Sequence, residues 1–332
     1  YGVGLKTSSA SQLSALRDGT AGNWDRALRT TTEAAPGAAD TFFISPELTG
    51  AGTGNSIEVT MNNNTATDFG LGGAAGTNAL DITGAALLTG KLTYSTVANT
   101  QLRLSGDLNA WSGGTFNIGT VVTPVPSGTT AILEFDCGVA VDYGLTVQNE
   151  GTMVAQGASM TAVTALLAAD AAAAATALTT NIATGWKNGD DICIASTTRI
   201  STECENKALT ADAVGTGLTI TAITNAHSGT SPTQGELGNL TRNVRIGAVT
   251  ASLPTFVDIR NFATVDWDYV AVANIGSATA TKRGIDCNPT TGSVDIRYSV
   301  IRDVKTSGMA LYLSAATADN VTFRFNIVYN VV

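Results

Sequence analysis

The chain has 332 residues, of which 44% are hydrophobic and only 14% charged, so it can bury a continuous core under a surface covered largely by Thr, Ser and Asn. The formal net charge is −9 and the sequence holds no Lys/Arg cluster, which argues against nucleic-acid binding, because that requires a basic patch to neutralise phosphates. The longest apolar tract, Val163 to Leu178, is interrupted by Asp170 and falls short of the roughly 20 residues of a membrane span.

Residues 1–22 are expected to form an N-terminal extension or cap. From there on, short apolar runs bounded by Gly, Asn, Asp and Thr recur, and helical periodicity is nearly absent, which indicates many short strands. The runs are residues 56–61, 91–94, 101–105, 115–118, 131–135, 145–147 and 152–154. Strands this short and closely spaced are typical of a solenoid, so we predict an all-β fold, a right-handed single-stranded parallel β-helix.

An Ala-rich stretch, residues 162–180, is the one place where a helix competes with this reading. It contains no Gly or Pro, and Ala has the highest helix propensity. Residues 176–182 return to β-type side chains. We therefore expect at most a short helix near residues 163–175.

The segment after this stretch carries the most specific pattern. It reads Gly185-Trp-Lys-Asn-Gly-Asp-Asp-Ile-Cys-Ile-Ala-Ser-Thr197, then Glu203-Cys-Glu205, Ala226-His-Ser-Gly229 and Glu236-Leu-Gly-Asn-Leu-Thr-Arg-Asn-Val-Arg-Ile246. This order resembles the closing half of the G-eight domain, a glycine-rich β-helical module of large cell-surface and hyaluronan-degrading proteins. A weaker likeness to its opening half, at Asn23-Trp24 and at residues 35–44, implies a G-eight-like domain over residues 23–247.

Six motif residues of this segment are expected to serve the fold. Asp190 follows Gly189 and can close a turn through its side chain, while Trp186 can cover the end of the apolar core. Arg242 can pair with Glu203, Glu205 or Glu236. The full set is Trp186, Gly189, Asp190, His227, Arg242 and Asn243.

Residues 248–332 are expected to form further coils, in a pattern that continues beyond the given sequence. The runs 257–261, 270–274, 294–298, 300–303 and 321–326 alternate apolar and polar residues. Asn or Asp at the end of a run is expected to mark a corner, because these residues tolerate left-handed backbone angles.

Little in the chain indicates redox, metal or cofactor chemistry. His227 is the only histidine, so no second imidazole can join it, and we expect no metal site and no cofactor. In the hyaluronan-degrading relatives the coils after the G-eight domain carry a histidine-rich segment, whereas residues 282–289 hold no histidine. Cys193 and Cys204 form a disulfide only if neighbouring coils bring them together, and buried thiols are the favoured reading.

Acidic residues of the last third are the weak catalytic candidates. Asp266 and Asp268 flank Trp267, so alternation places both carboxylates on one outer face, close to Arg260, with Asp286 as a third candidate. Solvated acids of a coil face are the favoured interpretation. Trp267, Tyr269 and Tyr312 are the candidate platforms on which a glycan would stack.

The leading functional hypothesis is a non-catalytic structural or adhesive protein at an extracellular or virion surface, such as a phage decoration or fibre component or a bacterial cell-surface protein. Its expected partners are other surface or virion proteins and glycans, in an assembly that admits an oligomer. The alternatives are a carbohydrate-active enzyme, a polysaccharide lyase or hydrolase, and a glycan-binding module on a β-helix.

Overall fold

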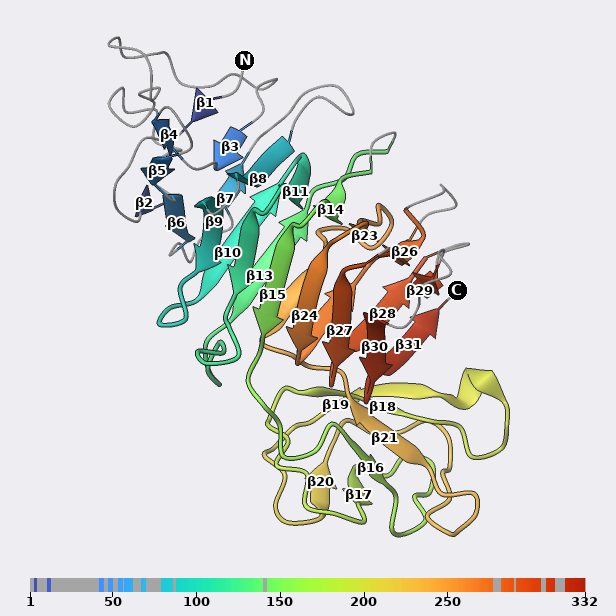
Figure 1. The fold of residues 1–332 in the computed structure, drawn as a ribbon. Helices are drawn as coiled ribbons and strands as arrows, with labels where there is room; N and C mark the ends of the chain where they lie inside the picture. The colour runs from blue at the N-terminus through green and yellow to red at the C-terminus, as the bar shows by residue number, and fades with distance from the viewer. Residues whose placement is uncertain are drawn as a thin grey trace. The chain divides into compact units, whose positions relative to one another are not determined.

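The computed structural model describes residues 88–139, 142–276, 282–289, 291–305, 309–313 and 320–331, together with eight short strands before residue 86. Within these ranges every element is a β-strand except one 3-10 turn, η1 (Ser201–Glu203) (Figure 1). The first strands are β1 (Val3–Gly4), β2 (Ser11–Gln12), β3 (Phe42–Ile44), β4 (Glu47–Thr49), β5 (Thr53–Asn55) and β6 (Ile57–Met61). Apart from β1 and β2, the predicted extension of residues 1–22 lies outside the described residues.

Three sets of parallel strands, here called faces 1, 2 and 3, form the main body of the chain, and faces 1 and 2 are joined where β8 (Ala79–Ala85) pairs antiparallel with β9 (Leu88–Tyr94). Face 1 consists of β8 (Ala79–Ala85), β11 (Asp107–Trp111), β14 (Gly144–Val147), β23 (Phe256–Arg260), β26 (Gly284–Asn288) and β29 (Met309–Leu313). Face 2 consists of β9 (Leu88–Tyr94), β12 (Thr115–Ile118), β15 (Thr152–Gln156), β24 (Thr264–Asp268), β27 (Ser293–Arg297) and β30 (Val321–Arg324). Face 3 consists of β7 (Thr67–Phe69), β10 (Thr100–Leu104), β13 (Ala131–Phe135), β22 (Val244–Ala248), β25 (Val270–Ala273), β28 (Val300–Val304) and β31 (Ile327–Val331).

The chain visits the faces in the fixed order 3, 1, 2, so each coil adds one strand to every face. Neighbouring strands within a face pair in parallel, as β15 does with β24 and β24 with β27. The predicted parallel β-helix is therefore confirmed, and the strand runs predicted between residues 56 and 154 lie in or overlap described strands.

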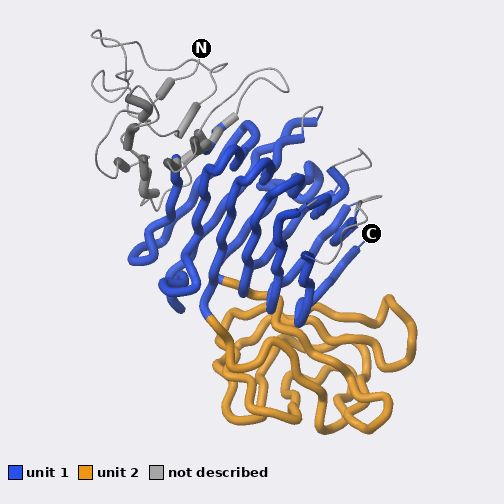
Figure 2. Tube along the Cα trace, in the orientation of Figure 1, with its two compact units in different colours: residues 1–158, 243–332 blue, residues 159–242 orange. Residues whose placement is uncertain are grey.

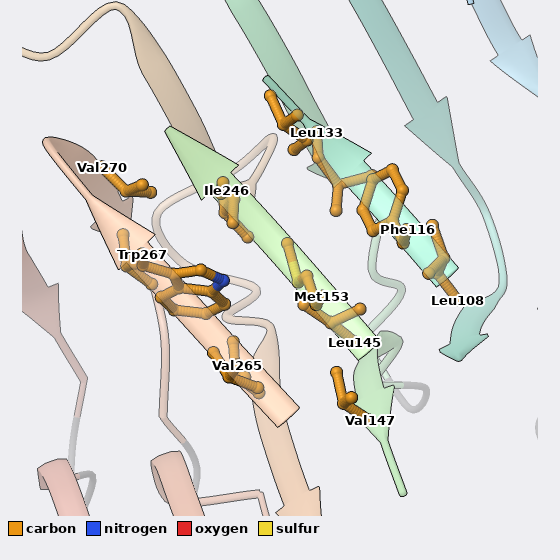
Figure 3. Close-up of a cluster of buried hydrophobic side chains, with 14 of the residues drawn as sticks. Leu108, Phe116, Leu133, Leu145, Val147, Met153, Ile246, Val265, Trp267 and Val270 are labelled. Atoms are coloured by element: carbon orange, nitrogen blue, oxygen red, sulfur yellow. The ribbon is translucent and has the colours of Figure 1, made fainter. Parts of the chain in front are cut away.

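Aliphatic side chains stack between coils to form the core of this helix. Strict alternation of buried and half-buried residues along β10, β13 and β24 sends every second side chain inward. The register then places inward residues in columns, one of which contains Phe116, Met153, Val265 and Val294. All four are at most 1% exposed, and Figure 3 shows the first three on successive strands. Burial of apolar area at about 25 cal/mol per Å² makes such columns the main source of stability.

Corners between strands follow the predicted rule in part. Asn261 and Asn274 directly follow β23 and β25 with φ of +46° and +56°, and Asp303 has φ of +57° at the last residue but one of β28. Asn and Asp accept this left-handed conformation because their short side chains bond the local backbone. The prediction that Asn or Asp marks a corner is confirmed at Asn261 and Asn274, whereas Asp303 lies within its strand.

Two compact units divide the chain (Figure 2). Unit 1, which contains the β-helix, spans residues 1–158 and 243–332, and unit 2 spans residues 159–242. Unit 2 is thus an insertion between β15 of face 2 and β22 of face 3. The domain boundary at residue 247 rests on the family resemblance and stays a prediction.

Unit 2 is an antiparallel β structure with its own core, made of buried side chains that include Trp186, Leu167 and Ile192. One sheet has the order β16, β21, β18, β19 and a second pairs β17 with β20. Their bounds are β16 (Thr164–Leu166), β17 (Ala177–Thr179), β18 (Asp191–Ile194), β19 (Glu205–Ala208), β20 (Gly217–Thr219) and β21 (Glu236–Asn239).

The short helix predicted near residues 163–175 is wrong. β16 pairs antiparallel with β21, and Ala171 forms a bridge with His227. Ala165, Leu167 and Ala171 are buried at even spacing, which is the period of a strand. The helix preference of Ala is only a few tenths of a kcal/mol per residue, so pairing with a distant strand overrides it.

Candidate functional site

Three carboxylates surround one guanidinium on the outer surface of face 2, and we call Asp266, Asp268, Asp295 and Arg297 the carboxylate cluster. Asp266 pairs in register with Asp295, and Asp268 with Arg297. Arg297 Nε and Nη2 lie 2.8 and 3.0 Å from the two oxygens of Asp268, a bidentate ion pair. Asp295 Oδ1 lies 3.2 Å from Nε and Asp266 Oδ1 lies 3.4 Å from Nη2. Alternation correctly placed Asp266 and Asp268 on one outer face.

The cluster contains three carboxylates and one guanidinium, and this excess of negative charge affects the pKa values of its groups. Burial raises the pKa of Asp268 above its ordinary value, the Arg297 guanidinium lowers it, and Asp266 and Asp295 raise it again. Burial lowers the pKa of Arg297, but Asp268, Asp295 and Asp266 together raise it. Oxygens left over from the ion pair can accept hydrogen bonds from hydroxyl groups.

The other acids of interest lie on face 1, away from this cluster. Arg260 was expected near Asp266 and Asp268, but its Nε donates to both oxygens of Asp258, at 2.7 and 2.6 Å. Asp286 pairs in register with Asp258. The structure therefore does not join Asp286 to the candidates of face 2.

Asp258 and Asp286 are 7% and 2% exposed, respectively. Burial raises the pKa of Asp258, Arg260 lowers it, and Asp286 raises it again. A carboxyl as deeply buried as that of Asp286 offers little surface to a substrate. Its candidacy as a catalytic acid is therefore weak on geometric grounds.

Trp267 points into the core, so its prediction as a glycan platform is wrong. Its side chain is 0% exposed, and Figure 3 shows it beside Val265 and Val270 inside the helix. In its column it lies between Ala155 and Ile296, where the small Ala155 leaves room for the indole. Since Asp266 and Asp268 point outward, alternation itself requires the residue between them to point inward.

Three aromatic residues form a ladder at the corner between faces 2 and 3. Tyr269, Tyr298 and Phe325 follow β24, β27 and β30 with φ of +57°, +52° and +57°. The rings of Tyr269 and Tyr298 stack with centroids 5.1 Å apart and planes at 11°, and those of Tyr298 and Phe325 at 5.2 Å and 7°. We call these three residues the aromatic ladder.

Only Tyr269 of this ladder was a candidate from the sequence. Tyr298 and Phe325 were missed, because a bulky residue is not expected in left-handed backbone. The signal is a repeat: each aromatic residue directly follows the charged last residue of a face 2 strand, at spacings of 29 and 27 residues.

The ladder is not explained by stability alone. A left-handed non-glycine residue costs roughly 1–2 kcal/mol, while a stacked aromatic pair contributes about 0.5–1.5 kcal/mol beyond its burial. Three strained residues against two stacked pairs leave little net gain. Asn261 and Asn274 turn the other corners of the coil in the same backbone conformation with side chains that tolerate it better, and Gly119 turns the corner after β12 of face 2 with φ of +74°. Strain retained where a relaxed residue would fit is typical of functional sites.

Tyr312 lies on face 1, in register with Asp286. The guanidinium carbon of Arg283 lies 4.5 Å from the centroid of its ring. One ring face of Tyr312 is thus covered by a cation, which leaves less of the ring for a sugar. Its predicted role as a stacking platform stays a prediction.

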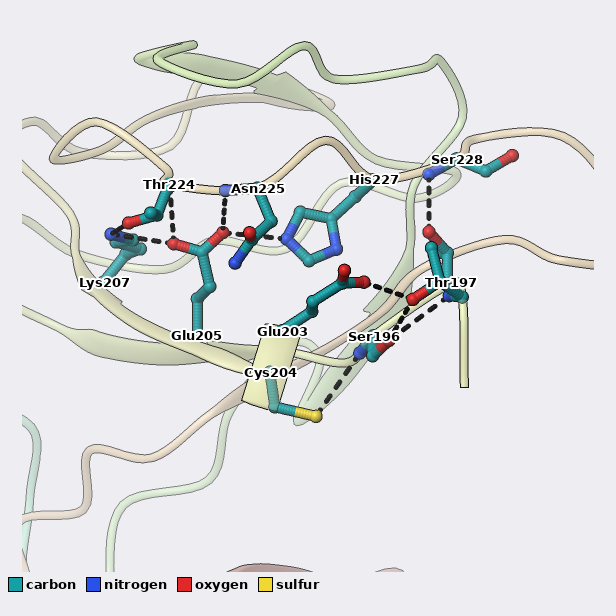
Figure 4. Close-up of polar contacts among 11 residues, drawn as sticks. Ser196, Thr197, Glu203, Cys204, Glu205, Lys207, Thr224, Asn225, His227 and Ser228 are labelled. Atoms are coloured by element: carbon teal, nitrogen blue, oxygen red, sulfur yellow. Dashed lines mark hydrogen bonds and ion pairs between the residues drawn. The ribbon is translucent and has the colours of Figure 1, made fainter. Parts of the chain in front are cut away.

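In unit 2 the buried carboxylate of Glu205 contacts His227, the histidine of the sequence motif (Figure 4). Glu205 accepts hydrogen bonds from the backbone N–H groups of Thr224 and Asn225 at 2.6 and 2.7 Å. Lys207 Nζ and His227 Nε2 lie 2.9 and 3.1 Å from its oxygens. Burial alone would raise the pKa of Glu205, but these contacts lower it to about 2. His227 is 2% exposed, so its imidazole braces the fold and does not face solvent.

The turn predicted after Trp186 has the expected geometry. Asp190 Oδ2 accepts hydrogen bonds from the Lys187 backbone N–H at 2.8 Å and from Asn239 Nδ2 at 2.7 Å. Gly189 supplies the left-handed residue of the turn with φ of +87°. The side chain of Asp190 therefore fastens the turn to β21.

Trp186 and Arg242 also serve unit 2. Trp186 is 1% exposed in the core of this unit, and its Nε1 donates to the Ala162 carbonyl at 2.7 Å. Arg242 Nη1 donates to the carbonyls of Asn239 and Thr241 at 2.9 and 2.7 Å. These contacts hold the last residues of the insertion, and the pairing of Arg242 with an acid stays a prediction.

Asn243 fastens the return of the chain into the β-helix. Its Oδ1 accepts a hydrogen bond from Ala158 N at 2.9 Å. Its Nδ2 lies 3.0 to 3.1 Å from the carbonyls of Val125, Pro126 and Thr129. One amide thus joins both ends of the insertion point to the loop that precedes β13.

Cys193 and Cys204 carry thiols, so no disulfide joins them, but Cys193 is half-buried and Cys204 exposed, so the expected burial is wrong for this pair. Cys137 and Cys287 are buried thiols, and burial raises the pKa of each, to about 11 and about 12. Among the described residues, no group of three or more His, Cys, Asp or Glu side chains is placed to hold a metal ion. No helix among the residues that the structure describes is long and apolar enough to cross a membrane.

Comparison with known proteins adds little to this description. No family model matches the chain, and no curated protein matches it. Among solved structures it is similar to the Gp54 tailspike of Acinetobacter baumannii bacteriophage AP22, solved in complex with A. baumannii capsular saccharide. The sequences are 13% identical, the TM-score is 0.23, and the match covers 73% of this chain and 41% of the tailspike chain. The fold assignment rests on the strand pairing described above, because a likeness this weak carries no weight of its own.

Proposed function

We propose that the chain is a non-catalytic surface scaffold that binds a glycan along the corner between faces 2 and 3. The binding surface would consist of the aromatic ladder and the adjoining carboxylate cluster. The observation that carries this proposal is the ladder: three aromatic residues, one per coil, hold a strained backbone conformation without a clear gain in stability.

The chemistry of the surface suits a polyhydroxylated ligand. Tyr269 follows Asp268, and Tyr298 follows Arg297. Because the rings stack on one another and Asp268 pairs in register with Arg297, a column of charged groups runs beside the column of rings. Carboxylates accept hydrogen bonds from sugar hydroxyls and guanidinium groups donate to them, while rings supply apolar contact to the sugar C–H faces. A few oriented polar groups beside aromatic side chains are the usual composition of a small-molecule site.

Catalysis is the less favoured reading of the same residues. Asp268 forms a bidentate ion pair with Arg297, and Asp266 contacts the same guanidinium. A pair of carboxyls working as acid and base flanks the bond that is cleaved, but here a cation occupies the space between them. Asp286, the third candidate, is buried on another face.

We also propose that the chain belongs to an extracellular or virion surface protein, such as a phage decoration or fibre component or a bacterial cell-surface protein. Low charge, a Thr-, Ser- and Asn-rich surface and the β-helix fit that setting. Its partners would be other surface or virion proteins in addition to the glycan. The G-eight-like domain over residues 23–247 remains part of this proposal.

Replacing Tyr298 with Asn tests whether the aromatic ladder serves glycan binding or the stability of the fold. Asn tolerates the left-handed conformation better, so Tyr298→Asn is expected to unfold at a temperature equal to or above that of the parent chain. If the ladder binds glycan, the same substitution reduces binding on an array of bacterial surface polysaccharides. Thermal unfolding followed by circular dichroism and array fluorescence are the two measurements.

Asn274→Gly is the matched control, since it alters a left-handed corner residue of another strand, β25. It is expected to leave glycan binding unchanged. A marked loss of stability in Tyr298→Asn with unchanged binding would assign the ladder to the fold and contradict the proposal.

A further inference from the structure

The corner between faces 1 and 2 is a tight turn in two successive coils, at residues 111–114 and 148–151. In each turn the N–H of the last residue donates to the carbonyl of the first at 2.9 Å. Both central residues have positive φ, which defines a type I′ turn. The second central residue is Gly113 in one coil, with φ of +83°, and Glu150 in the next, with φ of +66°.

Glu150 occupies a position that favours glycine. The second central residue of a type I′ turn is usually Gly, because left-handed backbone crowds any larger side chain. Gly113 avoids this strain one coil earlier. Glu150 is exposed and makes no hydrogen bond or ion pair with the described residues, so no local contact compensates for the strain. Strain retained in this way is typical of functional sites.

The next coil places an exposed aromatic ring beside this carboxylate. In each coil four residues lie between the register pairs that flank the corner, which are Val147 with Ile259 and Thr152 with Thr264. Phe262 therefore aligns with Glu150, and it is 53% exposed. Coils lie on both sides of Phe262, because β23 and β24 also pair with β26 and β27. Its exposure is thus a property of the corner itself.

Hydrogen bonds between coils fix the shape of this surface, which we call the 1/2 corner and define as residues 111–114, 148–151 and 260–263. The Thr264 N–H donates to the Gly151 carbonyl at 2.9 Å, and Asn261 Nδ2 lies 3.0 Å from Asn149 Oδ1. Arg260 is the only cation of the 1/2 corner, and its Nε donates to both oxygens of Asp258. The charge of Glu150 is therefore left for a ligand.

We propose that the 1/2 corner is a second sugar subsite, separate from the aromatic ladder, which binds a pyranose that carries an ammonium group. The apolar face of the sugar stacks on Phe262, and the ammonium group donates to the Glu150 carboxylate. Neighbouring coils lie about 4.8 Å apart, so one sugar residue reaches both groups. A sugar that carries a carboxylate would meet like charge at Glu150.

A sugar fits this surface better than a lysine side chain of a partner protein. Both would supply an ammonium group, but a lysine side chain loses up to about 2 kcal/mol of rotamer entropy when it is fixed. A pyranose is rigid and offers a flat apolar face to the exposed ring. Because the 1/2 corner lies outside the surface proposed above, either proposal can fail alone.

The test measures binding of methyl glycosides to the full chain by ligand-detected NMR. Glucosides, galactosides and mannosides are each used as the neutral sugar, the 2-amino sugar and the uronate, and Nα-acetyl-lysine amide supplies an ammonium group without a sugar ring. At least one amino sugar is expected to bind about threefold to tenfold more tightly than its neutral form at low salt, the range from an exposed ion pair to a charge-assisted hydrogen bond. The uronates should bind most weakly, and high salt should narrow the preference.

Glu150→Gly should abolish the preference for the amino sugar and, because glycine fits the turn, unfold at a temperature equal to or above that of the parent chain. Glu150→Gln, which keeps a hydrogen-bond acceptor without the charge, should bind the amino and neutral forms equally. Phe262→Leu should weaken binding of both forms, whereas Phe262→Tyr keeps the ring and should retain it. Arg199→Gly is the matched control, because Arg199 is also an exposed charged residue in left-handed backbone, with φ of +69°, and should leave sugar binding unchanged.

The outcomes separate this inference from the function proposed for the ladder. Equal binding of amino and neutral sugars, or a preference that survives Glu150→Gln, would overturn the ammonium assignment. Lysine amide bound as tightly as the best amino sugar would assign the 1/2 corner to a protein partner instead. Amino-sugar binding that survives Phe262→Leu but is lost in Tyr298→Asn belongs to the ladder, which would overturn the second subsite and leave the proposed function standing.

Discussion

Unit 2 should be removable without loss of the β-helix, because the insertion splits a single corner position. Gln156 pairs in register with Asp268, and Val244 pairs with Val270. Gly157, after Gln156, and the residue before Val244 therefore both align with Tyr269, the one corner residue of the next coil. Deletion of residues 158–243 joins Gly157 directly to Val244. The new connection has one corner residue, like the connection from Asp268 through Tyr269 to Val270.

The expected change in stability follows from the contacts that the deletion removes. The cores of the two units are separate clusters of buried residues. The main loss to the β-helix is the Asn243 amide, which holds the carbonyls of Val125, Pro126 and Thr129. At about 1 kcal/mol net per hydrogen bond, and with two amide hydrogens to share, we expect the free energy of unfolding to fall by about 1–3 kcal/mol. Gly157 can take the left-handed conformation at little cost.

Far-ultraviolet circular dichroism and urea unfolding of the shortened chain are the assays. A deletion one residue longer, of residues 157–243, is the matched control, because it joins Gln156 to Val244 with no corner residue and strains the register of both strands. The first variant should unfold in one cooperative transition at a clearly higher urea concentration than the control. Equal midpoints, or a shortened chain without β signal, would refute the view that unit 2 decorates an otherwise continuous helix.

Three further predictions concern single residues. Trp267→Ala should lower the free energy of unfolding by about 3–5 kcal/mol in urea titrations, as expected for a fully buried aromatic side chain, and an exposed-residue effect below 1 kcal/mol would contradict its place in the core. Because the contacts of Glu205 lower its pKa from 4.5 to about 2, its carboxylate adds stability that is fully present above pH 4.5 and is lost as the pH falls toward 2. The loss of unfolding free energy is of order 3 kcal/mol. Glu205→Gln should make the stability of the chain less dependent on pH, as measured by thermal unfolding between pH 2 and 6. Purified chain should not depolymerise the polysaccharides that it binds, and cleavage that disappears in Asp266→Ala or Asp268→Ala, followed by viscosity, would restore the enzymatic hypothesis.

The residue patterns of the sequence predict more of the fold than of the candidate site. Period-two alternation and short runs predicted the strands and the parallel β-helix, because an inward column tolerates only apolar residues and its effect is visible in every strand. The Ala-rich stretch misled, since its partner strand β21 lies some seventy residues away and propensity cannot register distant pairing.

The site was predictable only where local alternation decided it. The prediction that Asp266 and Asp268 point outward is correct, and the same alternation requires Trp267 between them to point inward, which its aromatic chemistry alone does not indicate. Arg297, the partner of both acids, comes from the next coil, and the register between coils is not written in the spacing of one strand. Tyr298 and Phe325 were missed because they occupy a backbone conformation that their side chains disfavour.

The corner between faces 2 and 3 is the part of a coil where the sequence can vary most. The insertion of unit 2 and the aromatic ladder both occur there. Inward positions are fixed by the columns of the core and outward positions by the pairing of faces, but a corner residue need only reverse the chain. At one coil that position is opened between Gly157 and Asn243 to admit unit 2, and in the following coils it carries the aromatic ladder. Change at this corner costs the core nothing, which is why binding groups concentrate on connections held by a rigid scaffold. A ligand that follows the ladder must then run across successive coils, so its recognition depends on the register between coils and weakens when that register is disturbed.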